Sequence, residues 1–370
     1  MIAMAYDAVT RFDLRAALSQ AARRWGSRLC QFVPVGLWQR IFPEPTLCLC
    51  YHMVSDTKVA HVKHYGFLGT AEFERDLQDL ESRFAYVSYE QIVERRLGLE
   101  SGPNTSVCLT FDDGFAECVS VVRPILLRHG ATCIFFIVTD LIDNHAVFLE
   151  TRASLCVDAI LRHPVDAVEG IVRDLGLEAR LLTAENAHRG TVPAQMAQQW
   201  RKFDPRLRSL LIWLLTIRSA DADLLDQLSR RLDVNAAEYV DKFKPYLSTE
   251  QILQLRSDGF VIGAHSCSHR RLQDLPVEEA EREIVESCRV IQELTGQASV
   301  PFAFPYFGGG LDRLWLAKLR ERHPFIGLFF DTQGLRRDAP FVVQRVFGER
   351  IEETGLIDRL LRRAWVRRLS

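Results

Sequence analysis

The chain has 370 residues, of which 48% are hydrophobic and 25% charged, and its formal net charge is −2. This length accommodates one large α/β domain with an insertion, and the charge gives no electrostatic basis for binding nucleic acid. The most apolar run, Leu210–Leu215, is far shorter than the roughly 20 residues of a membrane-spanning helix. We therefore expect no nucleic-acid partner and no transmembrane segment.

Within the N-terminal segment, residues 1–45, one or two helices are predicted over residues 11–45, and Pro43 and Pro45 end them. Packing on the main domain is the favoured interpretation of this arginine-rich segment, and contact with a membrane surface is the alternative. The first ten residues lack the basic segment and apolar core of a signal peptide, and the nine cysteines form no C-x-x-C pair. These features predict a cytoplasmic protein with reduced thiols.

From residue 46 onward, short β-like runs alternate with helical patterns. The expected strands are Thr46–Tyr51, Val107–Phe111 and Ala131–Val138. Helices are expected from about Thr70, with Thr70 as the N-cap, and over about Val119–His129. Residues 141–245 break the alternation with leucine-rich helical segments and no convincing strand, which predicts a helical insertion.

The alternation resumes near residue 248. The expected elements are helices over Thr249–Ser257 and about Pro276–Thr295, and strands over Phe260–Ala264, Val300–Phe304, Phe325–Phe330 and Val342–Val346. Strands that alternate with helices imply a parallel sheet or barrel whose chemistry gathers at the C-terminal strand ends. The sequence therefore predicts an N-terminal helical extension over 1–45 and a catalytic domain over 46–370, interrupted at about 141–245.

Carboxylates and imidazoles follow two of the expected strands. Asp112 and Asp113 come after one strand, and His265 and His269 come after another. Adjacent carboxylates repel each other unless a positive charge lies near, and two histidines four residues apart can converge on one cation. Two histidines and one carboxylate leave coordination positions open, and the second aspartate can serve as a general base. The residues themselves therefore predict metal-assisted hydrolysis of an amide or an ester.

These motifs resemble those of the polysaccharide deacetylases of carbohydrate esterase family 4, which contain the chitooligosaccharide-deacetylase (NodB) homology domain. Thr110–Gly114 is similar to the first motif of that family, His265–His269 to the second, and Ala303–Tyr306 to part of the third. The resemblance covers most of residues 46–140 and 246–350. It implies a distorted (β/α) barrel with fewer than eight regular units, zinc as the usual metal, and removal of N-acetyl groups from an amino-sugar substrate.

The resemblance also implies roles for individual residues. Asp112 would be the catalytic base, and the backbone N–H of Tyr306 would stabilise the oxyanion. The implied metal ligands are Asp113, His265 and His269.

The chain departs from the family pattern in two places. Ala303 stands where the third motif usually has an arginine that orients the base, and Arg345 is the candidate for that role. The family's late histidine, which protonates the leaving amine, has no clear match after Tyr306. Some members place this histidine at an N-terminal strand end instead, so His52 is the preferred candidate for the acid.

Two other functions stay open at this point. The missing motif arginine and late histidine also fit a carbohydrate-binding relative that lacks catalysis. The same metal chemistry also serves hydrolysis of an O-acetyl ester or of another amide. The favoured prediction is a deacetylase whose partner is an N-acetylated carbohydrate, in a polymer, an oligosaccharide or a glycoconjugate.

Overall fold

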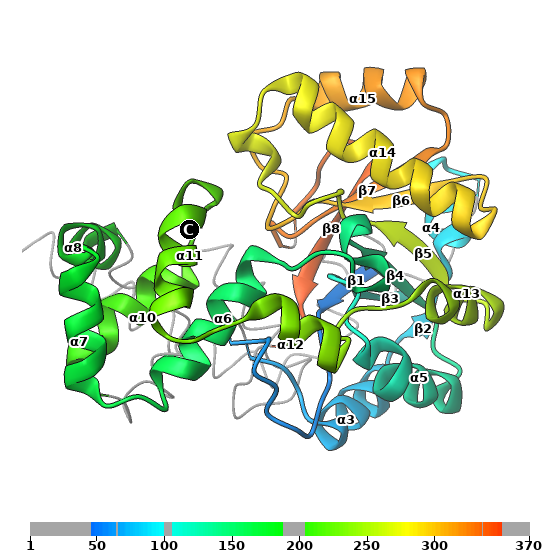
Figure 1. The fold of residues 1–370 in the computed structure, drawn as a ribbon. Coiled ribbons are helices and arrows are strands. Elements are labelled where there is room, and N and C mark those ends of the chain that lie inside the picture. Colours follow the sequence, from blue (N-terminus) through cyan, green and yellow to red (C-terminus); the bar gives the residue numbers. More distant parts are fainter. Residues whose placement is uncertain (1–45, 64–65, 100–105, 188–203, 335, 350–370) are drawn as a thin grey trace, which may run out of the picture.

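The computed structural model describes residues 46–63, 66–99, 106–187, 204–334 and 336–349 (Figure 1). The helices expected over residues 1–45, and their alternative membrane contact, lie outside these described residues. Within the described ranges, no helix combines the length and the apolar character that a membrane crossing requires.

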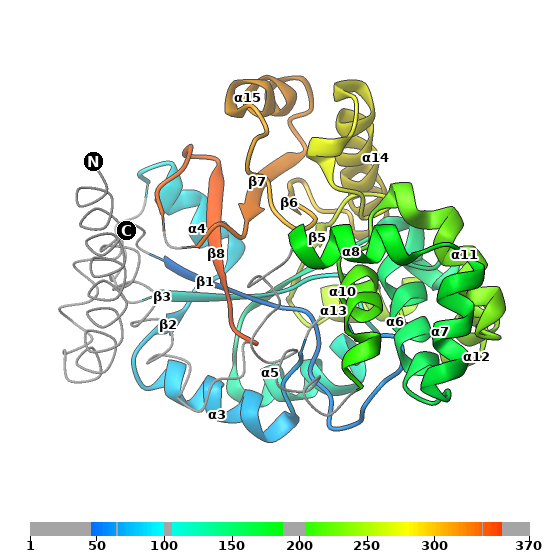
Figure 2. The ribbon, with the colours of Figure 1, turned by 90° about the vertical axis from the view of Figure 1, so that its left-hand side faces the viewer.

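Seven parallel strands close into a barrel. They are hydrogen-bonded in the order β1-β8-β7-β6-β5-β4-β3, and β3 pairs again with β1 (Figure 2). A short eighth strand, β2, pairs with the start of β3. The strands are β1 (Thr46–Tyr51), β2 (Ala85–Tyr86), β3 (Ser106–Phe111), β4 (Cys133–Ile137), β5 (Val261–Ala264), β6 (Val300–Ala303), β7 (Ile326–Asp331) and β8 (Val342–Phe347). The expected distorted (β/α) barrel with fewer than eight regular units is confirmed.

Helices surround the barrel, and the apolar faces of five of the described ones pack with the outward side chains of the strands in one hydrophobic core. These five helices are α3 (Thr70–Glu81), α5 (Arg123–His129), α13 (Thr249–Ser257), α14 (Val277–Thr295) and α15 (Arg313–Arg322). The helix α4 (Tyr89–Arg96) instead packs Tyr89 and Ile92 with the inward side chains of the strands. The prediction of Thr70 as the N-cap of α3 was wrong, because Gly69 occupies that position. The hydroxyl of Thr70 instead donates to Asp56, which also accepts the Thr70 backbone N–H.

Alternate side chains of each strand fill the barrel interior. Phe136 of β4 and Phe330 of β7 lie there with ring centroids 5.1 Å apart. Gly263 of β5 is required beside them, because a Cβ at this position would lie 2.4 Å from the ring of Phe136. On β3, the same alternation places Thr110 and then Asp112 towards the interior and its carboxyl end. The strand pattern thus positions the first of the predicted site residues.

Between β4 and β5 the described chain is helical and forms a lobe beside the barrel (Figure 1). Its helices are α6 (Leu149–Ile160), α7 (Val165–Asp174), α8 (Glu178–Ala187), α10 (Arg208–Leu215), α11 (Ala222–Arg231) and α12 (Ala236–Phe243). The lobe has a hydrophobic core of its own, which includes Trp213. Phe148, at the start of α6, instead packs with Phe115 of the barrel. The domain limits given by the sequence stay predictions, but α6 reaches the carboxyl end of the barrel.

Candidate active site

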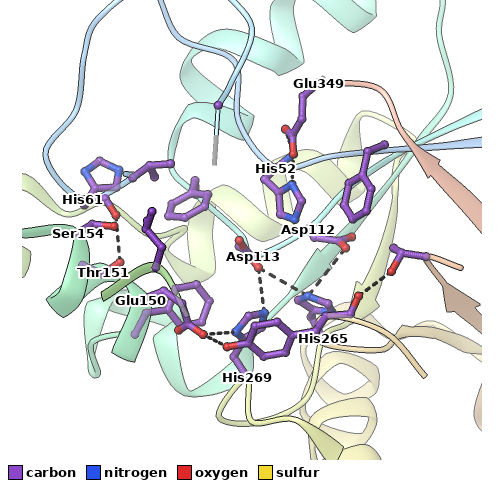
Figure 3. Close-up of a pocket in the computed structure, with 18 of the residues that line it drawn as sticks. His52, His61, Asp112, Asp113, Glu150, Thr151, Ser154, His265, His269 and Glu349 are labelled. Atoms are coloured by element: carbon purple, nitrogen blue, oxygen red, sulfur yellow. Dashed lines mark hydrogen bonds and ion pairs between the residues drawn. The ribbon is translucent and has the colours of Figure 1, made fainter. Parts of the chain in front are cut away.

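A cavity of about 340 Å³ lies at the carboxyl end of the barrel strands (Figure 3). The predicted site residues that line it are His52, Asp112, Asp113, His265, His269 and Tyr306. The seventh predicted residue, Arg345, lies in β8 and contacts Asp112 from inside the barrel. The structure therefore brings all seven residues together, and their roles stay predictions.

Asp113, His265 and His269 form a cluster whose geometry suits a metal ion. Oδ1 of Asp113 lies 3.6 Å from Nε2 of His265 and 3.4 Å from Nε2 of His269. All three side chains offer ligand atoms within 4.8 Å of one another. Zinc holds nitrogen and oxygen ligands at about 2.0–2.1 Å, which in a tetrahedron places them roughly 3.4 Å apart. The donor set and its spacing therefore fit the expected zinc ion.

The loops that carry these ligands have unusual backbone conformations. Asp113, Ser266 and His269 have φ values of 72°, 65° and 59°, in the left-handed region that non-glycine residues rarely adopt. The second loop is held in shape because the backbone N–H of His269 donates to Oγ of Ser266 at 2.9 Å. Glu283 of α14 accepts two further backbone N–H groups of this loop, each at 2.9 Å. Such strained residues cluster at functional sites, where the surrounding structure holds them in place.

His265 is held in the form that binds a metal. Its Nδ1 lies 2.9 Å from the carbonyl oxygen of Ala303, which can only accept a hydrogen bond. The proton therefore resides on Nδ1, and Nε2 presents its lone pair to the cluster. Burial lowers the pKa of His265 to about 4, so the imidazole is neutral near pH 7. A metal-ligating histidine must be neutral.

The second histidine has a carboxylate behind it that comes from the helical lobe. Oε1 of Glu150, in the first turn of α6, lies 3.4 Å from Nδ1 of His269, and the hydroxyl of Tyr306 donates to the same carboxylate (Figure 3). Burial alone would lower the pKa of His269, but Glu150 raises it. A carboxylate in this place fixes the ring orientation of a ligand histidine. Glu150 could not be predicted from the sequence, because it lies in a region without recognisable motifs.

We expect Glu150→Gln to weaken binding of zinc by roughly 10–100-fold, the usual effect of losing such a supporting carboxylate. The measurement is a competition titration of metal-free protein with a chromophoric zinc chelator. Glu178→Gln is the matched control, because Glu178 is an exposed glutamate in the first turn of another helix of the lobe, α8. Equal zinc affinities for the Glu150 variant and the unmodified protein would contradict this role.

Asp112 is paired with Arg345 inside the barrel. Nη1 and Nη2 of Arg345 donate to the two carboxylate oxygens at 2.6 and 2.8 Å, and the arginine side chain is fully buried. Nη1 also donates to Oγ1 of Thr110 at 3.0 Å. Burial alone would raise the pKa of Asp112, but Arg345 lowers it well below its usual range. Asp112 is therefore an oriented, ionised carboxylate, which supports the predicted roles of base and orienting arginine.

A second group of potential ligands lies next to the first and comprises Cys50, His52 and Asp112. Burial raises the pKa of the Cys50 thiol, so the sulfur is protonated and donates to Oδ2 of Asp112 at 3.4 Å. Metals bind the thiolate rather than the thiol, and both oxygens of Asp112 already accept hydrogen bonds from Arg345. The cluster of Asp113, His265 and His269 is therefore the better metal site.

His52 is held by Glu349, which follows β8. One oxygen of Glu349 accepts the backbone N–H of His52 at 2.9 Å, and the other is hydrogen-bonded to Nδ1 of the ring. Burial alone would lower the pKa of His52, but the charge of Glu349 raises it to about 9. The imidazole is therefore protonated near pH 7, as a general acid must be. Glu349 is a second residue that the sequence did not reveal.

If protonated His52 is the general acid, kcat/KM should fall as pH rises through about 9, the pKa of this side chain. Glu349→Gln removes the largest of the charges that raise this pKa, so burial then lowers it against the remaining charges of Asp113 and Asp112 alone. We therefore expect the alkaline limb of the pH profile to move to lower pH. An unchanged alkaline limb in the variant would assign the acid to another group.

Tyr306 forms one wall beside the metal cluster. Its ring lies between the ring of His269, at 5.0 Å, and the guanidinium of Arg271, at 4.6 Å. Its φ of 61° is again in the left-handed region. The predicted role of its backbone N–H at an oxyanion stays a prediction.

The fold and the site define a (β/α)-barrel protein whose polar residues gather at the carboxyl ends of the strands, where barrel enzymes carry their chemistry. A comparison with protein families gives a more specific result. The family model described as polysaccharide deacetylase matches residues 219–320, a segment that includes His265, His269 and Tyr306. No curated protein matches the chain. The predicted resemblance to polysaccharide deacetylases is confirmed.

Solved structures that share the fold include the following two. The Streptococcus pyogenes deacetylase PplD in complex with acetate has a TM-score of 0.50 at 13% identity, with 85% of this chain and 96% of that chain covered. IcaB from Ammonifex degensii has a TM-score of 0.50 at 16% identity, with 86% and 97% covered. At these identities the likeness establishes the fold of the chain.

Proposed function

We propose that the protein is a metal-dependent hydrolase that removes the N-acetyl group from an amino-sugar-containing substrate. The observation that carries the proposal is the buried cluster of Asp113, His265 and His269 beside the ionised carboxylate of Asp112. The family match supports an amide of an amino sugar as the scissile group. PplD, which shares the fold, is itself a deacetylase with acetate bound.

A divalent cation in this cluster, for which zinc is the expected ion, would polarise the amide carbonyl and lower the pKa of water. Asp112 accepts the proton of the attacking water, and Arg345 keeps Asp112 ionised and correctly oriented. The backbone N–H of Tyr306 donates to the developing oxyanion. His52, protonated and held by Glu349, donates its proton to the leaving amine.

The test is release of acetate from a panel of N-acetylated sugars, from monosaccharide conjugates to polymers, before and after removal of metal. We expect the purified protein to retain roughly one divalent ion, as sites with these ligands do. Chelation should abolish acetate release, and added zinc should restore it. Full activity in metal-free protein would contradict the proposal.

The alternative of a carbohydrate-binding protein without catalysis is less favoured. The reasons for it were that Ala303 stands where the family motif has an arginine, and that no histidine after Tyr306 matches the family's general acid. Arg345 contacts Asp112, and His52 with Glu349 forms an acid pair, so both functions have candidates among the described residues. Analysis of the released product distinguishes an amide substrate from an O-acetyl ester. The cytoplasmic location stays a prediction from the sequence.

A further inference from the structure

The cavity continues past the metal cluster towards the helical lobe, along a row of aromatic rings. The ring of Phe148 lies 4.8 Å from that of His269, Phe115 lies 6.3 Å from Phe148, and His61 lies 5.6 Å from Phe115. We call this part of the cavity the lobe-side arm; it is lined by His61, Val62, Phe115, Phe148, Thr151, Ser154 and Leu215. The arm thus connects the ligand His269 with helices α6 and α10 of the lobe.

The polar groups of the lobe-side arm are already hydrogen-bonded within the protein. Oγ1 of Thr151 accepts from the hydroxyl of Tyr246 at 2.9 Å and donates to the carbonyl of His61 at 3.5 Å. Oγ of Ser154 accepts the backbone N–H of Lys63 at 3.0 Å. Nδ1 of His61 is 2.9 Å from the hydroxyl of Tyr239.

Among the fully buried side-chain nitrogen and oxygen atoms of the arm, Nε2 of His61 alone has no hydrogen bond within the described residues. Burial lowers the pKa of this histidine to about 4, so it is neutral near pH 7. One neutral nitrogen cannot satisfy the several hydroxyls of a sugar ring, and a buried hydroxyl without a partner is costly. The arm is therefore suited to an apolar group.

The placement of the reacting groups indicates which apolar group this is. The amide oxygen belongs at the cluster of Asp113 and the two histidines, the attacking water at Asp112, and the leaving nitrogen at His52. In Figure 3, His52, Asp112 and His265 lie to the right of Asp113, whereas His61, Thr151 and Ser154 lie to its left. The sugar leaves with the nitrogen, on the side of His52. The remaining substituent of the carbonyl carbon, the acyl chain, therefore points into the lobe-side arm.

The arm reaches further than an acetyl group needs. The cavity of about 340 Å³ also holds the metal cluster and the space beside His52, so its whole volume does not belong to the arm. From the ring of Phe148 the arm passes Phe115 and His61, at ring spacings of 6.3 and 5.6 Å, whereas the methyl group of an acetyl lies only about 1.5 Å from the carbonyl carbon. We propose that the lobe-side arm is an acyl-binding site and that the preferred substrates are amino sugars with N-acyl chains longer than acetyl, such as hexanoyl. This inference rests on the proposed amide hydrolysis and goes beyond it, because it extends the acyl group that is removed from acetyl to longer chains.

The experiment compares kcat/KM for N-acetyl-, N-butanoyl-, N-hexanoyl- and N-octanoylglucosamine, followed as release of the free amine. Each methylene that is fully buried favours binding by about fourfold. The four extra methylenes of hexanoyl therefore set a ceiling of roughly 200-fold over acetyl, and we expect a preference of at least about tenfold.

A variant that shortens the arm links any preference to this site. Leu215→Trp introduces a larger side chain at a half-buried position of the arm. We expect the hexanoyl-to-acetyl ratio of kcat/KM to fall by about tenfold. This is the loss in binding expected when one or two methylenes of the acyl chain are no longer buried. Leu182→Trp is the matched control, because Leu182 is an exposed leucine on α8 of the same lobe and does not line the cavity. The control variant should leave kcat/KM unchanged for both the acetyl and the hexanoyl sugar.

Three results decide between the hypotheses. A preference for hexanoyl that Leu215→Trp reduces supports the inference. An equal or greater kcat/KM for acetyl overturns the inference and leaves the proposed deacetylase function in place. If no sugar amide is hydrolysed, the proposed function fails, and calorimetric titration with N-hexanoyl- and N-acetylglucosamine decides the inference. Tighter binding of the hexanoyl sugar then supports an acyl site, and equal binding contradicts it.

Discussion

Replacement of Asp113 with asparagine is expected to lower kcat/KM for amide release by at least about a thousandfold, together with the affinity for zinc. Asparagine is the informative substitution, because Asp113 has a φ of 72° and asparagine tolerates the left-handed region, whereas alanine does not. The variant therefore removes the charge that faces both histidines and keeps the loop conformation. Bound zinc is measured by elemental analysis, and activity by amine release.

Asp143→Asn provides a control at the same kind of backbone position. Asp143 has a φ of 61°, and its carboxylate accepts from the backbone N–H and the hydroxyl of Thr249, at 2.7 and 2.8 Å. Asp143 does not line the cavity, so its variant should retain both zinc and activity, with at most a modest loss of stability. If Asp113→Asn bound zinc as tightly as the unmodified protein, Asp113 would not be a ligand.

The positions of Asp112, Asp113 and His265 could be predicted from the sequence because they follow buried strands. Parallel strands of a barrel end at the same edge, so residues after β3 and β5 meet although the helical lobe separates them in the chain. The alternation of strands and helices in the sequence was enough to predict that these residues meet at one end of the barrel. The exact closure of the barrel, by pairing of β1 with both β3 and β8, has no such signal in the sequence.

Arg345 illustrates a prediction that the sequence could only suggest. Its position in a late strand was visible, but its contact with Asp112 depends on register. Arg345 lies opposite Cys48 of β1, and β1 in turn pairs with β3, which leads into Asp112. A shift of one residue in β8 would turn the guanidinium out of the barrel.

Glu150 and Glu349 were not predicted at all, for a physical reason. Glu349 lies 297 residues from its partner His52, and Glu150 lies 156 residues from its partner Tyr306. Neither stands in a recognisable motif, and an isolated glutamate is most often a solvated surface residue. Only the path of the chain after β8, and the return of α6 to the barrel, bring these carboxylates to the two histidines.

Replacement of Asp112 with asparagine is expected to lower kcat/KM by about 10²–10⁴-fold, the usual contribution of a general base, while zinc remains bound. The substitution also leaves Arg345 buried without its anionic partner, which costs about 3–5 kcal/mol of stability. Loss of activity could then reflect unfolding. The double variant Asp112→Asn/Arg345→Met removes both charges, so it should recover most of this stability and still lack activity. Thermal unfolding and amine release measure the two effects separately.

The single variant Arg345→Met tests the same base in the opposite direction. Asp112 keeps its carboxyl group but loses the main cation that lowers its pKa, so the pKa rises relative to the unmodified protein. A general base must be deprotonated to accept a proton. The acid limb of the kcat/KM profile should therefore move to higher pH, and activity should return as the pH is raised. An acid limb that stays in place in Arg345→Met would show that Asp112 is not the group that accepts the proton.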